Sequence, residues 1–316
     1  MHGWLTRART RALALIAVPM LATSIIASST AQATPLRIGN WQDAVWAELW
    51  SPQSMPPGTN DWSCHPSAAH PVPVILVHGT IANAAISWQA LAPMLKNAGY
   101  CVYAFNYGAT WVTGGRFYAA NYIKPSAAEL STFVDKVRAS TLGAPVDLVG
   151  HSQGGGLMPR YYLKSLGGAS KVRTLVGLAP SNHGTTASGL ALLAIHLQTL
   201  GVPLVLWAGC YSCWDQEIGS SFVRELDQGG DTVAGPRYVQ IATKYDEVIT
   251  PQTSQSFLTG PNVLNIKIQD QCSNDYADHV AIMYDTNALQ NVLNVLGPNV
   301  PNFRATCSTV WPLFGG

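Results

Sequence analysis

Residues 146–154 read VDLVGHSQG and decide the fold of this chain, because they join an apolar run to a Gly-x-Ser-x-Gly motif. The run Val146–Val149 predicts a buried strand, and residues 154–166 predict a helix. A serine between a strand and a helix is typical of a nucleophile elbow, the sharp turn that presents a catalytic serine. Its glycines let the turn close without a Cβ clash. The motif therefore predicts Ser152 as a nucleophile; the alternative is an ordinary glycine-rich turn.

Apolar strands alternate with amphipathic helices on both sides of this motif. Strands are expected at 72–77, 101–105, 146–149, 172–178, 238–242 and 263–268, and helices at 87–98, 126–139, 154–166, 252–258 and 285–296. This alternation predicts an α/β domain with a mainly parallel central sheet and helices on both faces. Ser126 and Glu129 predict a capping box at the start of their helix. Pro159 predicts a kink, or weak first turns, in the helix after the motif.

The composition indicates a chain that buries a large core. Of its 316 residues, 47% are hydrophobic and only 11% are charged, which excludes a disordered acidic or basic tail. The 18 lysines and arginines balance 17 acidic residues. Without a basic excess, the chain has no stripe that would attract a phosphate backbone, so no nucleic acid partner is expected.

The first 33 residues predict a secretory signal peptide. Three arginines between residues 7 and 11 precede the apolar run Ala12–Ala27, and Ala31-Gln32-Ala33 forms a cleavage site. The alternative is an uncleaved anchor, but 16 residues interrupted by Pro19 fall short of the roughly 20 needed to span a bilayer. We therefore expect cleavage after Ala33, a secreted, extracellular protein without a transmembrane span, and a single catalytic domain over 34–316. A monomer is expected.

Six cysteines fit an exported protein with three disulfides. They are Cys64, Cys101, Cys210, Cys213, Cys272 and Cys307. Fifteen pairings are possible, and the order along the chain favours joining neighbours, first to second, third to fourth and fifth to sixth. A zinc site at Cys210 and Cys213 is the alternative, but no second closely spaced Cys or His pair accompanies it. No metal is expected.

A nucleophilic serine needs a base and an acid, which follow it on this type of fold in the order Ser, acid, His. His279 is the only histidine after residue 196, and it follows the strand at 263–268. Asp246 follows the strand at 238–242, with Glu247 as the less favoured neighbour. The sequence therefore predicts Ser152, Asp246 and His279 as catalytic residues.

An acyl-transfer site also needs hydrogen-bond donors for the oxyanion of the tetrahedral intermediate. One donor is the backbone N–H after the nucleophile, here that of Gln153. The other comes from the loop after the strand at 72–77, which reads His78-Gly79-Thr80. Thr80 and Gln153 are therefore the predicted oxyanion residues, and His78 is interpreted as structural.

One insertion lacks formal charge altogether. Residues 174–214 contain no Lys, Arg, Asp or Glu, and they form most of a predicted apolar cap over about 182–236. Leu190, Leu193 and Leu197 would line an acyl pocket or contact a lipid surface, where each buried methylene contributes about 0.8 kcal/mol. The alternative is a buried helix that completes the core.

The motifs His78-Gly79-Thr80, Gly150–Gly155, Tyr245–Ile249 and Asp278-His279 together resemble those of the secreted bacterial class 2 triacylglycerol lipases. They are more distantly similar to the fungal lipase B type. The resemblance covers roughly residues 60 to 300. It implies an α/β-hydrolase fold, ester hydrolysis without a cofactor, and a Thr80 hydroxyl that acts as an additional oxyanion donor.

These observations predict a serine ester hydrolase, a triacylglycerol lipase that works through an acyl-enzyme on long-chain esters at a lipid–water interface. Short-chain carboxylesterases, polyester hydrolases and acyltransferases would use the same residues and remain alternatives. A protein of another class, a non-catalytic hydrolase-fold protein that binds lipid or protein through the insertion, is the further alternative.

Overall fold

The computed structural model describes residues 1–3, 34–199, 203–298, 300–313 and 315. The predicted signal peptide therefore lies outside the described residues, apart from its first three. Residues Pro35–Gly316 form one unit. Within the described part of the chain, no helix combines the length and the hydropathy that crossing a membrane requires.

Strands and helices alternate along most of this unit. The order is α1 (Trp41–Trp50), β1 (Val74–Val77), α2 (Ala84–Ser87), α3 (Leu91–Asn97), β2 (Val102–Phe105), α4 (Ile123–Ser140), β3 (Val146–His151), η1 (Ser152–Gly154), α5 (Leu157–Ser165), η2 (Gly168–Ser170), β4 (Val172–Leu178), α6 (Ala187–Thr199), η3 (Leu204–Gly209), α7 (Tyr211–Gln216), α8 (Ser221–Asp227), β5 (Arg237–Ala242), β6 (Val263–Lys267), α9 (Ile268–Gln271), η4 (Ala281–Tyr284) and α10 (Thr286–Leu296).

The six strands form one parallel sheet in the order β2-β1-β3-β4-β5-β6. Val77 pairs with Gly150 at the ends of β1 and β3, and Leu178 pairs with Ile241 near the ends of β4 and β5. Because the strands are parallel and in this register, the loops after β1, β3 and β5 leave the same edge of the sheet. The α/β fold expected from the sequence is confirmed.

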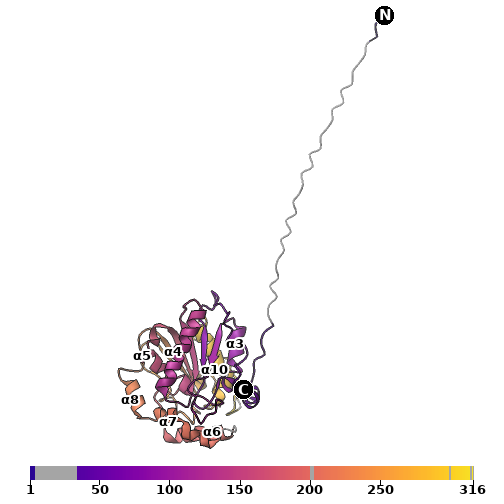
Figure 1. Ribbon diagram of the computed structural model, residues 1–316. Helices are drawn as coiled ribbons and strands as arrows, with labels where there is room; N and C mark the ends of the chain where they lie inside the picture. Colours follow the sequence, from indigo (N-terminus) through magenta and orange to yellow (C-terminus); the bar gives the residue numbers. More distant parts are fainter. Residues whose placement is uncertain (4–33, 200–202, 299, 314, 316) are drawn as a thin grey trace. The chain divides into compact units, whose positions relative to one another are not determined.

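Alternate strand residues divide the core between the two faces of the sheet. Val74 and Leu76 pack in a cluster with residues of α1, α3 and α10. Ile75 and Val77 pack on the opposite face with residues of α4, α5 and α8. Side chains alternate between the faces of a strand, so a sheet covered on both sides needs continuous apolar runs such as VILV. Figure 1 shows α3 and α4 flanking the sheet.

Three disulfides join the cysteines in the order favoured by the sequence. Cys64–Cys101 ties the segment before β1 to the start of β2, across 37 residues. Cys272–Cys307 ties the end of α9 to the C-terminal segment, across 35 residues. Cys210–Cys213 closes a short loop at the start of α7. Constraining loops of about 35 residues in the unfolded chain contributes roughly 3 to 4 kcal/mol for each cross-link.

The helix expected at 252–258 is absent, and the segment forms turns. Thr253 has a φ of 60°, which a right-handed helix does not allow. The carbonyl of Gln255 accepts the N–H of His183 at 3.0 Å, and that of Ser256 accepts from the Asn182 side chain at 2.6 Å. The prediction was wrong because the left-handed backbone at Thr253 interrupts the helical conformation, although the N–H groups of Gln255 and Phe257 still bond the carbonyls four residues earlier.

The helix expected at 87–98 begins only at Leu91, as α3, after a separate short helix, α2, that ends at Ser87. A continuous helix would need an N–H at position 93 to bond the carbonyl of Gln89, and Pro93 has none. The Gln89 carbonyl accepts the N–H of Gly39 at 2.9 Å. The chain therefore breaks at Trp88–Ala90, while Leu91 and Leu95 are buried as expected.

Two helices start at other residues than predicted. Helix α4 begins at Ile123, three residues before the predicted cap, so the Ser126 hydroxyl donates to the Tyr122 carbonyl at 2.9 Å and Glu129 accepts from the N–H of Gly108. Helix α5 begins at Leu157, so Pro159 lies in its first turn, where a missing N–H breaks no helical bond.

Candidate active site

Ser152 lies in a strained turn directly after β3. Its φ is 55°, a left-handed conformation that is uncommon for residues other than glycine. A Cβ at Gly150 would overlap the carbonyl of Gly154, and a Cβ at Gly154 would overlap the carbonyl of His78. The two glycines therefore allow the close backbone approach that holds Ser152 in this turn, as a nucleophile elbow requires.

The structure brings Ser152, His279 and Asp246 into one hydrogen-bonded row. His279 Nε2 lies 3.1 Å from Ser152 Oγ, and His279 Nδ1 lies 3.0 Å from Asp246 Oδ2. Asp246 follows β5, and His279 lies in the loop between α9 and η4. All three side chains are buried. With a carboxylate on Nδ1, the imidazole carries its proton there and leaves Nε2 free to accept the serine proton.

The backbone of its own loop fixes the Asp246 carboxylate. Its Oδ1 accepts the N–H groups of Val248 at 3.0 Å and Ile249 at 2.7 Å, which leaves Oδ2 for His279. The alternative acid, Glu247, points elsewhere, because its Oε1 lies 3.0 Å from His196 Nδ1 of α6. The geometry therefore favours Asp246 as the partner of the imidazole.

Burial and nearby carboxylates act in opposite directions on His279. Its complete burial lowers the pKa, but the charge and hydrogen bond of Asp246, with the charges of Glu247 and Asp278, outweigh this and leave the pKa raised above 6.5. His151 is equally buried beside His279, and burial followed by the charge of His279 holds the pKa of His151 well below 6.5. His151 is therefore neutral at neutral pH.

The raised pKa of His279 sets an expected pH dependence of the activity. His279 must be neutral to accept the serine proton, so activity is lost when it is protonated, and its raised pKa moves this loss to a pH above 6.5. We expect kcat/KM for a soluble ester to rise with pH, with a midpoint above 6.5, and then to level off. A profile from about pH 5 to about pH 9 measures it. A midpoint below 6.5 contradicts the expectation.

Thr80 and Gly79 bring the loop after β1 against the nucleophile. A Cβ at Gly79 would lie 3.1 Å from Ser152 Cβ and 2.9 Å from His151 Nδ1, so only glycine fits. Thr80 lines the same cavity as Ser152. The Thr80 hydroxyl donates to Gln153 Oε1 at 2.9 Å. The two predicted oxyanion residues therefore contact each other beside the nucleophile.

Two residues near this row were missed by the sequence reasoning. Gln216 of α7 donates its side-chain N–H groups to Thr80 and to Gln153. His151 Nε2 lies 2.8 Å from the backbone carbonyl of His279, to which the neutral ring donates. His151 could have been found from its place in the motif. No pattern marks Gln216, which is 136 residues from Thr80 in the sequence.

The cavity beside Ser152 is apolar and small. Its volume is about 50 Å³. The lining residues are Trp41, Glu48, Gly79, Thr80, Ile81, Ala82, Ile86, Phe117, His151, Ser152, Leu193, Leu197, His279, Val280 and Met283. Leu193 and Leu197 of α6 thus border the nucleophile, whereas the third predicted substrate-binding residue, Leu190, does not line this cavity.

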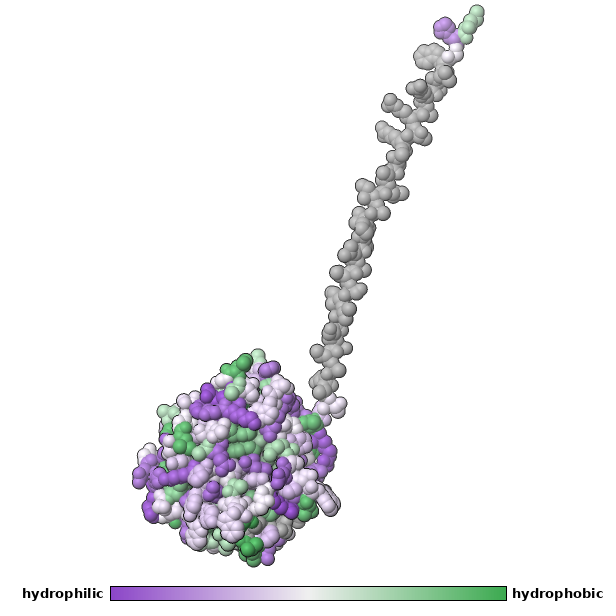
Figure 2. Space-filling view, in the orientation of Figure 1, coloured by the Kyte–Doolittle hydropathy of each residue, from purple (hydrophilic) through white to green (hydrophobic). Residues whose placement is uncertain are grey.

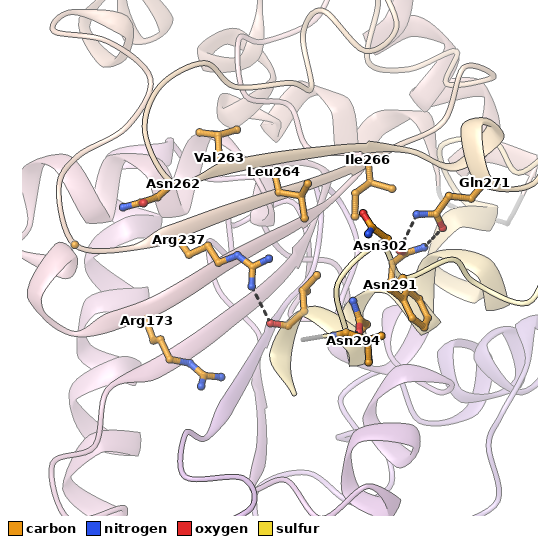
Figure 3. A pocket seen from close by; sticks show the side chains of 14 residues that line it. Arg173, Arg237, Asn262, Val263, Leu264, Ile266, Gln271, Asn291, Asn294 and Asn302 are labelled. Atoms are coloured by element: carbon orange, nitrogen blue, oxygen red, sulfur yellow. Dashed lines mark hydrogen bonds between the residues drawn. The ribbon is translucent and has the colours of Figure 1, made fainter. Parts of the chain in front are cut away.

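A larger cavity, of about 720 Å³, lies at the opposite edge of the sheet. Arg173 and Arg237 line it near the amino ends of β4 and β5, whereas Ser152 follows the carboxyl end of β3. Figure 3 shows Asn291 hydrogen-bonded to Gln271, and Arg237 donating to a backbone carbonyl. The site chemistry does not involve this cavity.

Among the described residues, one group has the composition of a metal site: His183, Asp227 and Asp231. The fully buried guanidinium of Arg160 lies 3.2 Å from Asp227 and 3.7 Å from Asp231. Because the arginine already supplies a cation to both carboxylates, these residues fit an ion-pair network better than a metal centre.

Comparison with known proteins assigns the chain to a family. The model of the class 2 lipases matches residues 71–292. A solved structure of lipase B from Aspergillus fumigatus is 20% identical, with a TM-score of 0.60, over 85% of this chain and 61% of the fungal chain. The mature lipase BlEst2 of Bacillus licheniformis is 15% identical, with a TM-score of 0.55, over 74% of this chain and 94% of that chain. This chain thus spans about three fifths of the fungal protein, and both likenesses support the α/β-hydrolase fold.

Proposed function

We propose that this chain, which belongs to the class 2 lipase family, is a carboxylic ester hydrolase and, more specifically, a secreted triacylglycerol lipase acting through an acyl-enzyme. The observation that carries the mechanism is the row of short contacts from Ser152 through His279 to Asp246. The predicted signal peptide and the three disulfides support secretion.

In the first half of the reaction, Ser152 Oγ attacks the ester carbonyl carbon while His279 Nε2 takes the hydroxyl proton. The imidazolium that forms is stabilised by Asp246. The carbonyl oxygen becomes negative, and the backbone N–H groups of Thr80 and Gln153, with the Thr80 hydroxyl, donate to it. His279 then returns the proton to the leaving alcohol, and the acyl group remains on Ser152.

In the second half, water takes the place of the alcohol. His279 removes a proton from water, the hydroxide attacks the acyl carbonyl carbon, and the same donors hold the oxyanion. The bond to Ser152 Oγ breaks, His279 protonates the serine oxygen, and the fatty acid leaves. An acyltransferase would differ only in the acceptor that replaces water.

The surface of the insertion supports a lipid substrate. On α6, Leu193 and Leu197 face the cavity while Ile195 is 51% exposed. Val205 of η3 is 69% exposed and Trp214 of α7 is 70% exposed. Hydrophobic residues appear in Figure 2 at the end of the domain where Figure 1 labels α6. An insertion that exposes several large apolar side chains is a candidate surface for contact with lipid or a partner.

We expect Val205→Asp to separate lipid binding from catalysis. Losing the burial of one valine at an interface costs roughly 1.5 to 3 kcal/mol, so hydrolysis of emulsified triolein should fall about tenfold or more. Hydrolysis of dissolved nitrophenyl acetate should be little changed. Initial rates on the two substrates measure this difference.

Val300→Asp is the matched control, because Val300 is 56% exposed at the edge of the larger, remote cavity. Both activities should survive in this variant. Equal loss of both activities in Val205→Asp, or no loss at all on the emulsion, contradicts a lipid-contacting role for the insertion.

A short-chain carboxylesterase is the second candidate, and the cavity volume favours it. Ligand sites commonly have 300 to 1,000 Å³, and the space beside Ser152 is about 50 Å³. A long acyl chain therefore requires Leu193 and Leu197 to move away. A series of nitrophenyl esters from acetyl to palmitoyl, below and above their solubility limits, distinguishes the two. A hydrolysis rate that falls steadily from acetyl to longer esters, and does not increase at the emulsion surface, supports the esterase.

A further inference from the structure

Gln216 connects the insertion to the two residues of the oxyanion site. It is the last residue of α7, three positions after the disulfide Cys210–Cys213, and it is 2% exposed. Its backbone carbonyl accepts the N–H of Thr185 at 2.8 Å, and its side-chain Oε1 accepts the hydroxyl of Ser181 at 3.2 Å. One bond therefore fixes the backbone of Gln216, and the other fixes the oxygen of its side-chain amide.

The amide nitrogen of Gln216 closes a hydrogen-bonded triangle. Nε2 donates to Thr80 Oγ1 at 2.8 Å and to Gln153 Oε1 at 3.0 Å. Thr80 Oγ1 in turn donates to Gln153 Oε1 at 2.9 Å. All three side chains are buried. Both protons of the amide are used, and the single proton of the Thr80 hydroxyl points to Gln153 in the absence of substrate.

The positions of these protons constrain catalysis. To donate to an oxyanion, the Thr80 hydroxyl must turn its proton away from Gln153 Oε1. A buried carbonyl left without a donor is unfavourable. Because the amide of Gln216 still donates to Gln153 Oε1, this turn leaves no buried acceptor unpaired. The bond from Gln216 to Oγ1 also polarises the hydroxyl, which makes it a stronger donor.

We propose that Gln216 is a positioning residue of the oxyanion site, which orients the Thr80 hydroxyl and keeps Gln153 Oε1 paired when that hydroxyl turns to the tetrahedral intermediate. The inference rests on the proposed acyl-transfer function. It assigns to the insertion a role beyond substrate contact, because a residue of α7 sets the orientation of donors that come from the loops after β1 and β3.

A double-mutant cycle with Thr80 tests the inference. Loss of one oxyanion donor commonly lowers kcat by 10² to 10³, so Gln216→Leu, which only disorients a donor, should lower kcat on nitrophenyl butyrate about 10- to 100-fold. KM should stay within about threefold. In a Thr80→Val background, the same substitution should cost less than about threefold, because no hydroxyl remains to be oriented.

A second readout separates orientation from simple damage to the fold. A trifluoromethyl ketone forms an oxyanion adduct with the serine, so its inhibition constant should rise by about the same factor as kcat/KM falls. Gln228→Leu, an exposed glutamine at the end of α8, is the matched control and should retain full activity. Equal losses with and without Thr80, or an unchanged inhibition constant, would overturn the proposal.

Gln216→Glu is the second test variant, to be used if Gln216→Leu does not fold. An ionised carboxylate cannot donate to Thr80 or Gln153, whereas the protonated acid can donate once. Its activity relative to the wild type at the same pH should therefore recover as the pH falls. A ratio that stays near one at every pH overturns the inference. Failure of the proposed function is distinct: the wild type would then hydrolyse no ester and form no ketone adduct.

Discussion

Replacement of Ser152 by alanine is expected to lower kcat/KM for a soluble nitrophenyl ester by at least about 10³, because it removes the atom that forms the acyl bond. The folded state should be little affected. The substitution removes the hydrogen bond between Oγ and His279 at 3.1 Å, but the strained turn is held by Gly150 and Gly154 rather than by the hydroxyl. Steady-state kinetics and a thermal melt of the same preparation measure both quantities.

Ser256 provides the matched control for this substitution. It is 1% exposed, as buried as Ser152, but it lies in the turns after Pro251, away from the residues that line the catalytic cavity. Ser256→Ala should keep the wild-type rate, and a fluorophosphonate should label it as it labels the wild type. Labelling of Ser152→Ala, or residual hydrolysis within about tenfold of the wild type, would falsify the nucleophile assignment. A wild type that is folded but unlabelled would favour the non-catalytic binding protein.

The candidate site was predictable because its members are marked by order and by local pattern. Each one follows a strand, and parallel strands bring their carboxyl ends to one edge of the sheet. This rule selected Thr80, Ser152 and Asp246, which come from the loops after β1, β3 and β5. His279 was found by elimination, since it is the only histidine after residue 196 in the sequence.

What could not be predicted depends on interactions between distant residues. Gln216 acquires its place from the packing of α7 against two loops more than 60 residues away. The turns at 252–258 contain the left-handed Thr253, and Asn182 and His183, from a distant loop, bond to two of their carbonyls. Which leucines of α6 face the nucleophile depends on how that helix docks, so Leu190 was chosen on the same grounds as Leu193 and Leu197.

Asp246→Asn should lower kcat/KM by about 10⁴ while the geometry of the site is kept. The N–H groups of Val248 and Ile249 both bond to Oδ1, so they hold the amide oxygen of the new asparagine in that place. Its NH₂ group then faces His279 Nδ1, which must accept a hydrogen bond instead of donating one. The imidazole proton moves to Nε2, and the nitrogen beside Ser152 can no longer accept the serine proton.

Glu247→Gln is the comparison that distinguishes the two acids. Glu247 contacts His196 rather than the imidazole of His279, so this variant should keep kcat within about threefold at the plateau of the pH profile. The charge of Glu247 is among the causes that raise the pKa of His279. Removing it should therefore lower that pKa and move the acidic limb of kcat/KM to lower pH, with the plateau retained. Only a group that fixes the tautomer of His279 can impose a loss of that size without disturbing the fold. If Glu247→Gln lost activity as severely as Asp246→Asn, the catalytic acid would therefore have been assigned to the wrong residue.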